Sequence, residues 1–205
     1  IDLITTHETL FFRDKSPFKN IKETIVPEWI AGPPRTSIDI YSAACSTGQE
    51  PVSVALMLRE SLPPTLWPKV KIVGSDISEA VIAYAKAGTY SQYEVQRGMP
   101  TKLLMKYFDQ KDTSWSLKED IKKKLDYRAE NLLMPRLAIR KFDLILCRNV
   151  TIYMDKPKVR KIYESLHSMM KEDAQLIIGH SERMTDHTDL FEYNRTPAGI
   201  IYKKI

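Results

Sequence analysis

Apolar residues gather in five short runs along the chain, each bounded by polar or turn-forming residues. Runs of this length, rich in Ile, Val and Leu, are typical of buried strands. Helical patterns lie between most of these runs, which predicts βαβ units and a mainly parallel sheet. We therefore expect an α/β fold with strands at residues 38–43, 70–75, 142–148, 175–180 and 199–204.

Capping residues and periodicity predict two helices with particular clarity. One runs from Glu79 to Ala87 and is closed by Gly88. The other begins after Asp155, a suitable N-cap, and has apolar residues at helical spacing. These apolar residues are Val159, Ile162, Tyr163, Leu166, Met169 and Met170. The last two predicted strands, joined by a long excursion through His187 and Tyr193, are expected to pair antiparallel.

The regular alternation breaks between residues 88 and 127. This stretch holds Gly98, Pro100, an amphipathic piece around 103–108 and a polar stretch at 109–114. We expect it to form a small inserted subdomain. The whole chain, 43% hydrophobic over 205 residues, is long enough to bury one good core.

Residues 42–51, with the sequence SAACSTGQEP, directly follow the first predicted strand. Small side chains there let the backbone approach a ligand closely, Gly48 permits a tight turn, and Pro51 suits the first position of a helix. The segment lacks both the G-x-G-x-x-G and the G-x-x-x-x-G-K-[ST] spacing. It therefore favours a cofactor that carries no phosphates.

An acid, Asp76, stands at the end of the second predicted strand. In an α/β unit this position is suited to accepting both hydroxyls of a ribose. The alternative is a helix N-cap, although Ser78 could serve that purpose instead. Together with a glycine turn that has no phosphate-binding lysine, Asp76 favours an adenosine bearing something other than phosphate.

Seven segments carry a resemblance to a known family, in the same order along the chain: TLFFRD (9–14), SAACSTGQEP (42–51), SDIS (75–78), RGMP (97–100), NLL (131–133), CRNV with IY (147–150, 152–153) and GHSE (179–182). They resemble the chemotaxis receptor glutamate methyltransferases, the CheR family, which use S-adenosylmethionine. The resemblance implies a class I, Rossmann-like methyltransferase fold over residues 37–205, with an inserted subdomain at about 88–127 that helps to engage the receptor. Residues 1–36 would form a linker and cofactor-clamp segment, and an upstream helical domain would be largely absent from this sequence.

The resemblance also assigns residues to the cofactor. Thr9 and Arg13 are similar to the clamp on its carboxylate, although Arg13 could instead be a surface salt-bridge residue. Glu50 resembles the acid that meets its ammonium group, and Asp76 resembles the ribose ligand. Where the family usually has asparagine, this chain has His7, whose neutral imidazole also offers one donor and one acceptor.

The remaining assignments lie near the adenine and the reacting methyl group. Asn131 and Leu132 fit the adenine edge, and Asn149 and Val150 line the cofactor near its reacting end. The resemblance makes Arg148 a candidate for holding the incoming glutamate and Tyr153 a candidate for orienting it. Tyr153 lies in an apolar stretch, so a plain core residue is the alternative.

Methyl transfer to a glutamate carboxylate makes few chemical demands on the protein. The carboxylate is already ionised at neutral pH, so no general base is needed. We expect no metal either, because the four histidines lie in unlike segments. Alignment and exclusion of water would carry the reaction, which leaves S-adenosylhomocysteine as product.

No apolar run approaches the roughly 18 residues that span a bilayer, and no signal peptide is visible. Two cysteines, Cys45 and Cys147, make no disulfide framework and are expected to be buried. No Cys–His arrangement suggests a nucleophile. These features predict a cytoplasmic protein.

The net charge of +5 is unevenly spread. Residues 136–161 hold eight basic side chains against two acidic ones, which is an excess of six. A basic face would attract an acidic partner, and the resemblance names glutamate-bearing cytoplasmic helices of chemoreceptors. Charge alone leaves two alternatives open, a nucleic-acid methyltransferase and a solvated helix face. A non-catalytic module that binds S-adenosylmethionine is a third possible function. The basic residues are Arg136, Arg140, Lys141, Arg148, Lys156, Lys158, Arg160 and Lys161.

Overall fold

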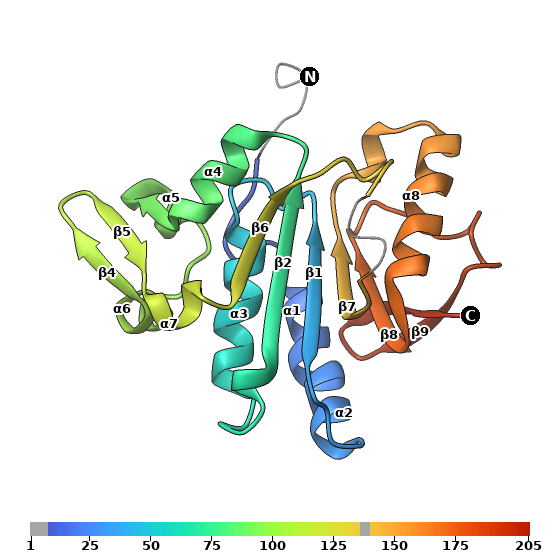
Figure 1. The fold of residues 1–205 in the computed structure, drawn as a ribbon, viewed down its shortest axis with the longest axis horizontal. Coiled ribbons are helices and arrows are strands. Elements are labelled where there is room, and N and C mark those ends of the chain that lie inside the picture. Colours follow the sequence, from blue (N-terminus) through green and yellow to red (C-terminus); the bar gives the residue numbers. More distant parts are fainter. Residues whose placement is uncertain (1–7, 136–139) are drawn as a thin grey trace.

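A computed structural model describes residues 8–135 and 140–205 of the chain. Within these residues a seven-stranded sheet runs in the order β6-β2-β1-β7-β8-β10-β9 (Figure 1). Five neighbouring strands, from β6 to β8, are parallel, and β10 is antiparallel to both β8 and β9. The strands are β1 Ile38–Ala43, β2 Val70–Asp76, β6 Leu125–Ala129, β7 Phe142–Cys147, β8 Met170–Ile178, β9 Phe191–Thr196 and β10 Gly199–Lys204.

All five strands predicted from the sequence are present. Those at 38–43 and 199–204 have the predicted bounds, and β2 and β7 differ by one residue at one end. Strand β8 begins five residues earlier than predicted and pairs with β7 through an irregularity between Phe142 and Leu144. The expected antiparallel pairing of β8 with β10 is confirmed, but the excursion between them contains a further strand, β9, which includes Tyr193.

Alternate residues of the central strands face two separate cores. Ile38 and Ile40 of β1 belong to the larger core, with helix α3 (Gln49–Ser61), whereas Tyr41 and Ala43 belong to the smaller one, with helix α8 (Lys156–Met169). This alternation is what the period of two along a strand dictates. The sheet is therefore a middle layer with helices on both faces.

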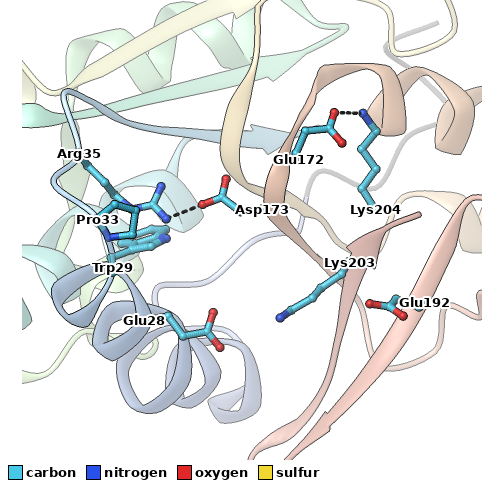
Figure 2. Close-up of a pocket in the computed structure, with 10 residues that line it drawn as sticks. Glu28, Trp29, Pro33, Arg35, Glu172, Asp173, Glu192, Lys203 and Lys204 are labelled. Atoms are coloured by element: carbon cyan, nitrogen blue, oxygen red, sulfur yellow. Dashed lines mark hydrogen bonds and ion pairs between the residues drawn. The ribbon is translucent and has the colours of Figure 1, made fainter.

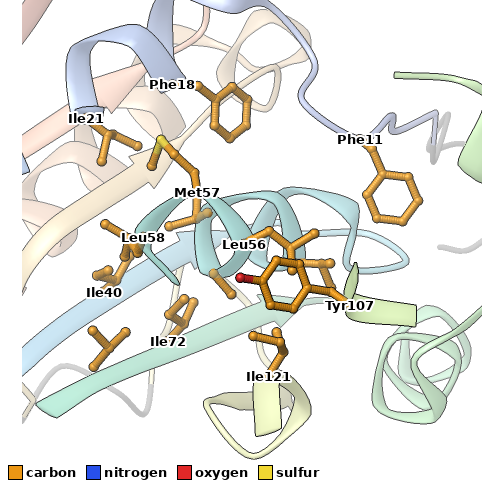
Figure 3. Packing of buried hydrophobic residues seen from close by; sticks show 14 of the residues in the cluster. Phe11, Phe18, Ile21, Ile40, Leu56, Met57, Leu58, Ile72, Tyr107 and Ile121 are labelled. Atoms are coloured by element: carbon orange, nitrogen blue, oxygen red, sulfur yellow. The ribbon is translucent and has the colours of Figure 1, made fainter. Parts of the chain in front are cut away.

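Residues 15–31 fold as helices, which differs from the linker expected for this part of the chain. Their bounds are α1 Lys15–Asn20, a π-helical turn Ile21–Ile25 and α2 Val26–Ala31. Phe18, Ile21 and Trp29 are buried in the larger core, where Figure 3 shows Phe18 and Ile21 near Met57 of α3. Burial of these side chains holds the segment against the sheet.

The predicted helix caps are confirmed. Helix α4 (Glu79–Ala87) ends at Gly88, which has the left-handed φ of 60°. The Asp155 carboxylate accepts the backbone N–H of Lys158 at 3.0 Å and caps α8. Met170 was expected on α8 but is the first residue of β8.

A second, antiparallel sheet with the order β3-β5-β4 lies to one side of the main sheet (Figure 1). It occupies the region where an insert was expected, although β6, from Leu125, already belongs to the main sheet. The three strands of this sheet and the helices around them are β3 Thr89–Ser91, α5 Gln92–Gln96, α6 Thr101–Tyr107, β4 Phe108–Lys111, β5 Ser114–Leu117 and α7 Glu119–Lys122. Among the helices of the described residues, none has the length and apolarity to cross a bilayer.

Candidate active site

The loop from β1 to α3 is a tight turn built on left-handed residues. Ala44 and Ser46 have φ of 52° and 50°, and Gly48 has φ of 93°. A Cβ on Gly48 would also lie 2.8 Å from the hydroxyl of Tyr127, so both conformation and packing require glycine here. Pro51 is the third residue of α3 and not the first, yet it still falls in the turn whose N–H groups lack helical partners.

Asp76 ends β2 beside this loop and is buried. One carboxylate oxygen accepts the backbone N–H of Ser46 at 2.9 Å, and the other accepts that of Ser78 at 3.2 Å. Helix α4 takes Ser78 as its N-cap, so the capping role considered for Asp76 is wrong. A carboxylate has about four acceptor positions, so Asp76 retains capacity for the two hydroxyls of a ribose.

Arg148 joins the ends of β1 and β7 to the N-terminal segment. Its Nη1 donates to Oε2 of Glu50 at 2.7 Å, and its Nη2 donates to Asp14 Oδ2 at 2.7 Å and to the Arg13 carbonyl at 2.8 Å. Oε1 of Glu50 accepts the Ser42 hydroxyl at 2.7 Å. With 2% of its side chain exposed, Arg148 is a buried bridge between three segments that are distant in sequence.

The N-terminal segment reaches the site through Arg13. Its Nη1 donates to the Glu8 carbonyl at 2.9 Å, and a guanidinium has further donors that suit a ligand carboxylate. Thr9 lies in the same extended stretch and is half-buried. His7, which was expected at the cofactor, lies outside the described residues.

This segment is anchored to the rest of the fold. The backbone N–H of Phe12 donates to the Ser53 hydroxyl of α3 at 2.9 Å. Gly98, with φ of 100°, lies so close to the carbonyl of Phe11 that any Cβ would collide with it. The glycine of the RGMP segment therefore serves packing against the N-terminal segment.

Asn131 and Leu132 follow β6 at the same edge of the sheet. The Asn131 side-chain carbonyl accepts the N–H of Leu133 at 2.9 Å, which leaves its amide NH₂ as a donor toward a base. Leu132 packs on the smaller core and is half-buried. These features fit an adenine edge.

The loop after β7 carries the last group of predicted residues. Asn149 has φ of 60°, Val150 follows it, and a 3₁₀ turn spans Thr151–Tyr153. The side chain of Tyr153 is largely in solvent, because the residue is 75% exposed. The alternative of Tyr153 as a core residue is therefore wrong.

Glu182 contacts this loop, although it was not among the site residues predicted from the sequence. It is buried and accepts hydrogen bonds from the backbone of Asn149, Val150 and Thr151. The only signal in the sequence is its place in the GHSE segment, since its partners lie more than thirty positions away.

The basic stretch does not form an open basic face in the part of the chain that the structure describes. Arg148 is buried, Arg160 pairs with both Asp189 and Glu164, and three of the other basic side chains also have an acidic neighbour, which lies within the stretch only for Lys158. Arg136 lies outside the described residues. The pairs in question are Arg140–Asp126, Lys156–Asp186 and Lys158–Asp155. Acids outside the stretch, at Asp126, Asp186 and Asp189, thus offset part of the positive charge that the linear count predicts.

Two clefts lie away from the predicted residues. One, of about 350 Å³, opens between α2 and strands β8 to β10, and Figure 2 shows Arg35 turned toward Asp173 and Lys204 toward Glu172 along its wall. The other, of about 430 Å³, adjoins the start of α8. Neither is lined by a predicted site residue. We call the region around Glu50, Asp76 and Arg148, near the carboxyl ends of β1, β2 and β7, the cradle.

Both cysteines are buried near this cradle. Burial raises the pKa of the Cys45 and Cys147 thiols well above the usual range. The thiolate is the nucleophilic form, so neither side chain is suited to nucleophilic chemistry at neutral pH.

The strand order identifies the class of protein. The chain turns from one half of the sheet to the other between β1 and β7, and open α/β sheets bind ligands outside the carboxyl ends of the strands at such a point. An acid at the tip of β2, a glycine turn without a phosphate-binding lysine, and an antiparallel strand inserted beside β8 define a class I S-adenosylmethionine-dependent methyltransferase.

The chain belongs to the CheR family: residues 7–200 match "CheR methyltransferase, SAM binding domain". It is 36% identical to chemotaxis protein methyltransferase 1 of Pseudomonas aeruginosa, over 99% of this chain and 76% of that protein. It is 37% identical to the chemotaxis protein methyltransferase of Vibrio anguillarum, over 99% of this chain and 74% of that protein. A similar protein of Borreliella burgdorferi is 36% identical over 93% of this chain and 69% of that protein. S-adenosylmethionine is thus the cofactor.

Proposed function

We propose that this protein is a glutamate O-methyltransferase that forms methyl esters on the cytoplasmic part of chemoreceptors. The observation that carries the proposal is the convergence of Asp76, Glu50 and Arg148 at the carboxyl ends of three strands, beside an exposed Tyr153. Residues in this arrangement suit a cofactor with ribose, ammonium and carboxylate groups. The similarity of the chain to chemotaxis protein methyltransferases is the reason for proposing a chemoreceptor as the substrate.

Each of these residues would bind a different group of the cofactor. Asp76 would hold the ribose, Glu50 the ammonium group, Arg13 the carboxylate, and Asn131 the adenine. When bound, S-adenosylmethionine supplies a methyl group on a sulfonium, which is transferred to a carboxylate oxygen. The cradle contributes by holding the cofactor in one orientation, and alignment of this kind is worth up to about 7–11 kcal/mol in favourable cases.

Arg148 and Tyr153 would act on the substrate side. The Tyr153 hydroxyl is free to donate to an incoming glutamate because the side chain extends into solvent. Arg148 is already bound to Glu50 and Asp14, of which Asp14 is the more exposed, at 47% of its side chain. A substrate carboxylate would reach the guanidinium most readily by replacing Asp14.

Receptor helices bearing glutamates, in the cytoplasm, remain the partner that this chemistry favours. A nucleic-acid methyltransferase loses part of its support, because most of the described basic side chains between residues 140 and 161 are paired with acids. A non-catalytic S-adenosylmethionine-binding module is not favoured either. In such a module the exposed Tyr153 side chain would have no substrate to contact.

Labelled S-adenosylmethionine with chemoreceptor cytoplasmic fragments tests the proposal. We expect label on the receptor, released by mild base because a methyl ester hydrolyses readily. The Asp76→Asn variant is the matched control on the enzyme, and a fragment with its target glutamates replaced by glutamine is the control on the substrate. Label that resists base, or that persists on the glutamine fragment, would contradict glutamate methylation.

A further inference from the structure

A single buried carboxylate gathers the backbone donors of the loop after β7. Oε1 of Glu182 accepts the N–H groups of Val150 and Thr151 at 2.9 and 2.8 Å, and the Thr151 hydroxyl at 2.8 Å. Oε2 accepts the N–H groups of Asn149 and Gly179, at 2.9 and 2.6 Å. Three consecutive amides of one loop thus point at one anion, a concave arrangement that backbone groups use to bind negative charge.

The conformation of the loop depends on this anion. Asn149 has the left-handed φ of 60°, which asparagine adopts more readily than most residues other than glycine, and Val150 is at φ of –114°. Regular helix or sheet pairing cannot satisfy three successive N–H groups in such a turn. A charged acceptor with strong hydrogen bonds stabilises it instead.

Gly179 makes room for the carboxylate. A Cβ at this position would lie 2.6 Å from Oε2 of Glu182 and 2.9 Å from the backbone nitrogen of Asn149. The backbone N–H of Glu182 donates in turn to the Gly179 carbonyl at 3.1 Å. The first and last residues of the GHSE segment therefore work as one unit, in which glycine admits the acid.

We propose that Glu182 is a positioning residue for methyl transfer, which holds Asn149 and Val150 against the cofactor and Tyr153 at the reacting end. The part of this proposal that concerns methyl transfer rests on the proposed function. The part that concerns cofactor binding does not. Each oxygen already accepts at least two hydrogen bonds, so Glu182 does not serve as a base. Its negative charge stabilises the conformation of the loop instead.

Glu182→Gln is the sharp test, because the amide is nearly isosteric. Either orientation of the amide turns its NH₂ group toward at least two N–H donors, so the loop loses its acceptor on one side. We expect the dissociation constant of S-adenosylhomocysteine, measured by calorimetry, to rise by about tenfold to a hundredfold. Amide exchange at 149–151 should accelerate in the same variant.

Asp143→Asn provides the matched control. Asp143 is also buried and lies on β7, at the end of that strand opposite to the loop that Glu182 binds, where it accepts from Arg35, Lys171 and the Asp39 backbone. We expect this variant to lose stability while its cofactor affinity and its turnover per folded molecule stay at the wild-type value. A merely structural role for Glu182 predicts that both variants behave alike.

If Glu182→Gln does not fold, Gly179→Ala provides a second test. The added methyl group would displace the Glu182 carboxylate without removing its charge. It should also weaken cofactor binding. Wild-type affinity and turnover in Gly179→Ala, or in a folded Glu182→Gln protein, would overturn the proposal. If the wild-type protein methylates no receptor fragment, the proposed function fails, yet the binding measurement still decides the role of Glu182.

Discussion

Replacing Arg148 by methionine should destabilise the protein by about 3–5 kcal/mol, because a buried ion pair loses one partner. The carboxylate left behind, Glu50, has 14% of its side chain exposed and would keep only the Ser42 hydroxyl among the contacts described above. Loss of the Asp14 contact adds less than about 1 kcal/mol, since 47% of that side chain is in solvent. Nearly all of the cost therefore comes from Glu50.

Urea unfolding of Arg148→Met, Glu50→Gln and the double variant measures this directly. The double variant removes both charges of the Arg148–Glu50 pair, so we expect it to be more stable than the sum of the single effects by about 2 kcal/mol. Asp14→Asn is the control and should cost less than about 1 kcal/mol. Additivity within about 0.5 kcal/mol, or an Asp14→Asn effect as large as that of Arg148→Met, would refute the buried bridge.

Three further predictions concern single side chains. Asp76→Asn should weaken binding of S-adenosylmethionine by about 1.5–3 kcal/mol in calorimetry, because a charged hydrogen bond to the ribose is lost; unchanged affinity removes the ribose role. Tyr153→Phe should lower kcat while unfolding and cofactor affinity stay near wild type, and a parallel loss of affinity would demote the hydroxyl to a structural role. Burial, aided by Arg160 and opposed by nearby carboxylates, lowers the pKa of His187 below 6.5. The unfolded chain therefore binds that proton more readily, so stability is full above pH 6.5 and falls below it; thermal unfolding of His187→Phe should show a weaker fall, and an identical pH profile would contradict this.

Much of the fold followed from local patterns in the sequence. Strand β1, strand β10 and helix α4 have their predicted bounds, because apolar runs and a closing Gly88 act locally. The Asp155 cap of α8 is equally local. Short-range rules suffice wherever the determining residues are neighbours in sequence.

The missed elements lack such signals. Strand β6 buries only Tyr127 and β9 only Phe191, so neither carries a clear alternation. Residues 15–31 contain two prolines and a π-helical turn, which obscure the helical period. These segments take their structure from packing against the sheet.

The candidate site shows the same division. The types of residue at the strand ends were visible in the sequence, but their partners were not. Arg148 meets Glu50 across 98 positions and Asp14 across 134, and the donors to Glu182 come from the loop after another strand. Part of the positive charge of residues 140–161 is likewise offset by acids that are distant in sequence, such as Asp189.

The most direct measurement of the central claim compares two receptor fragments that differ only at the methylation positions, one with glutamate and one with glutamine, each incubated with the protein and S-adenosylmethionine. Peptide mass spectrometry locates any methyl group. We expect methyl esters on the glutamates of the first fragment and none on the second, and less modification of the first fragment by the Asp76→Asn protein. Methylation of another residue type, or equal methylation of both fragments, would contradict the central claim.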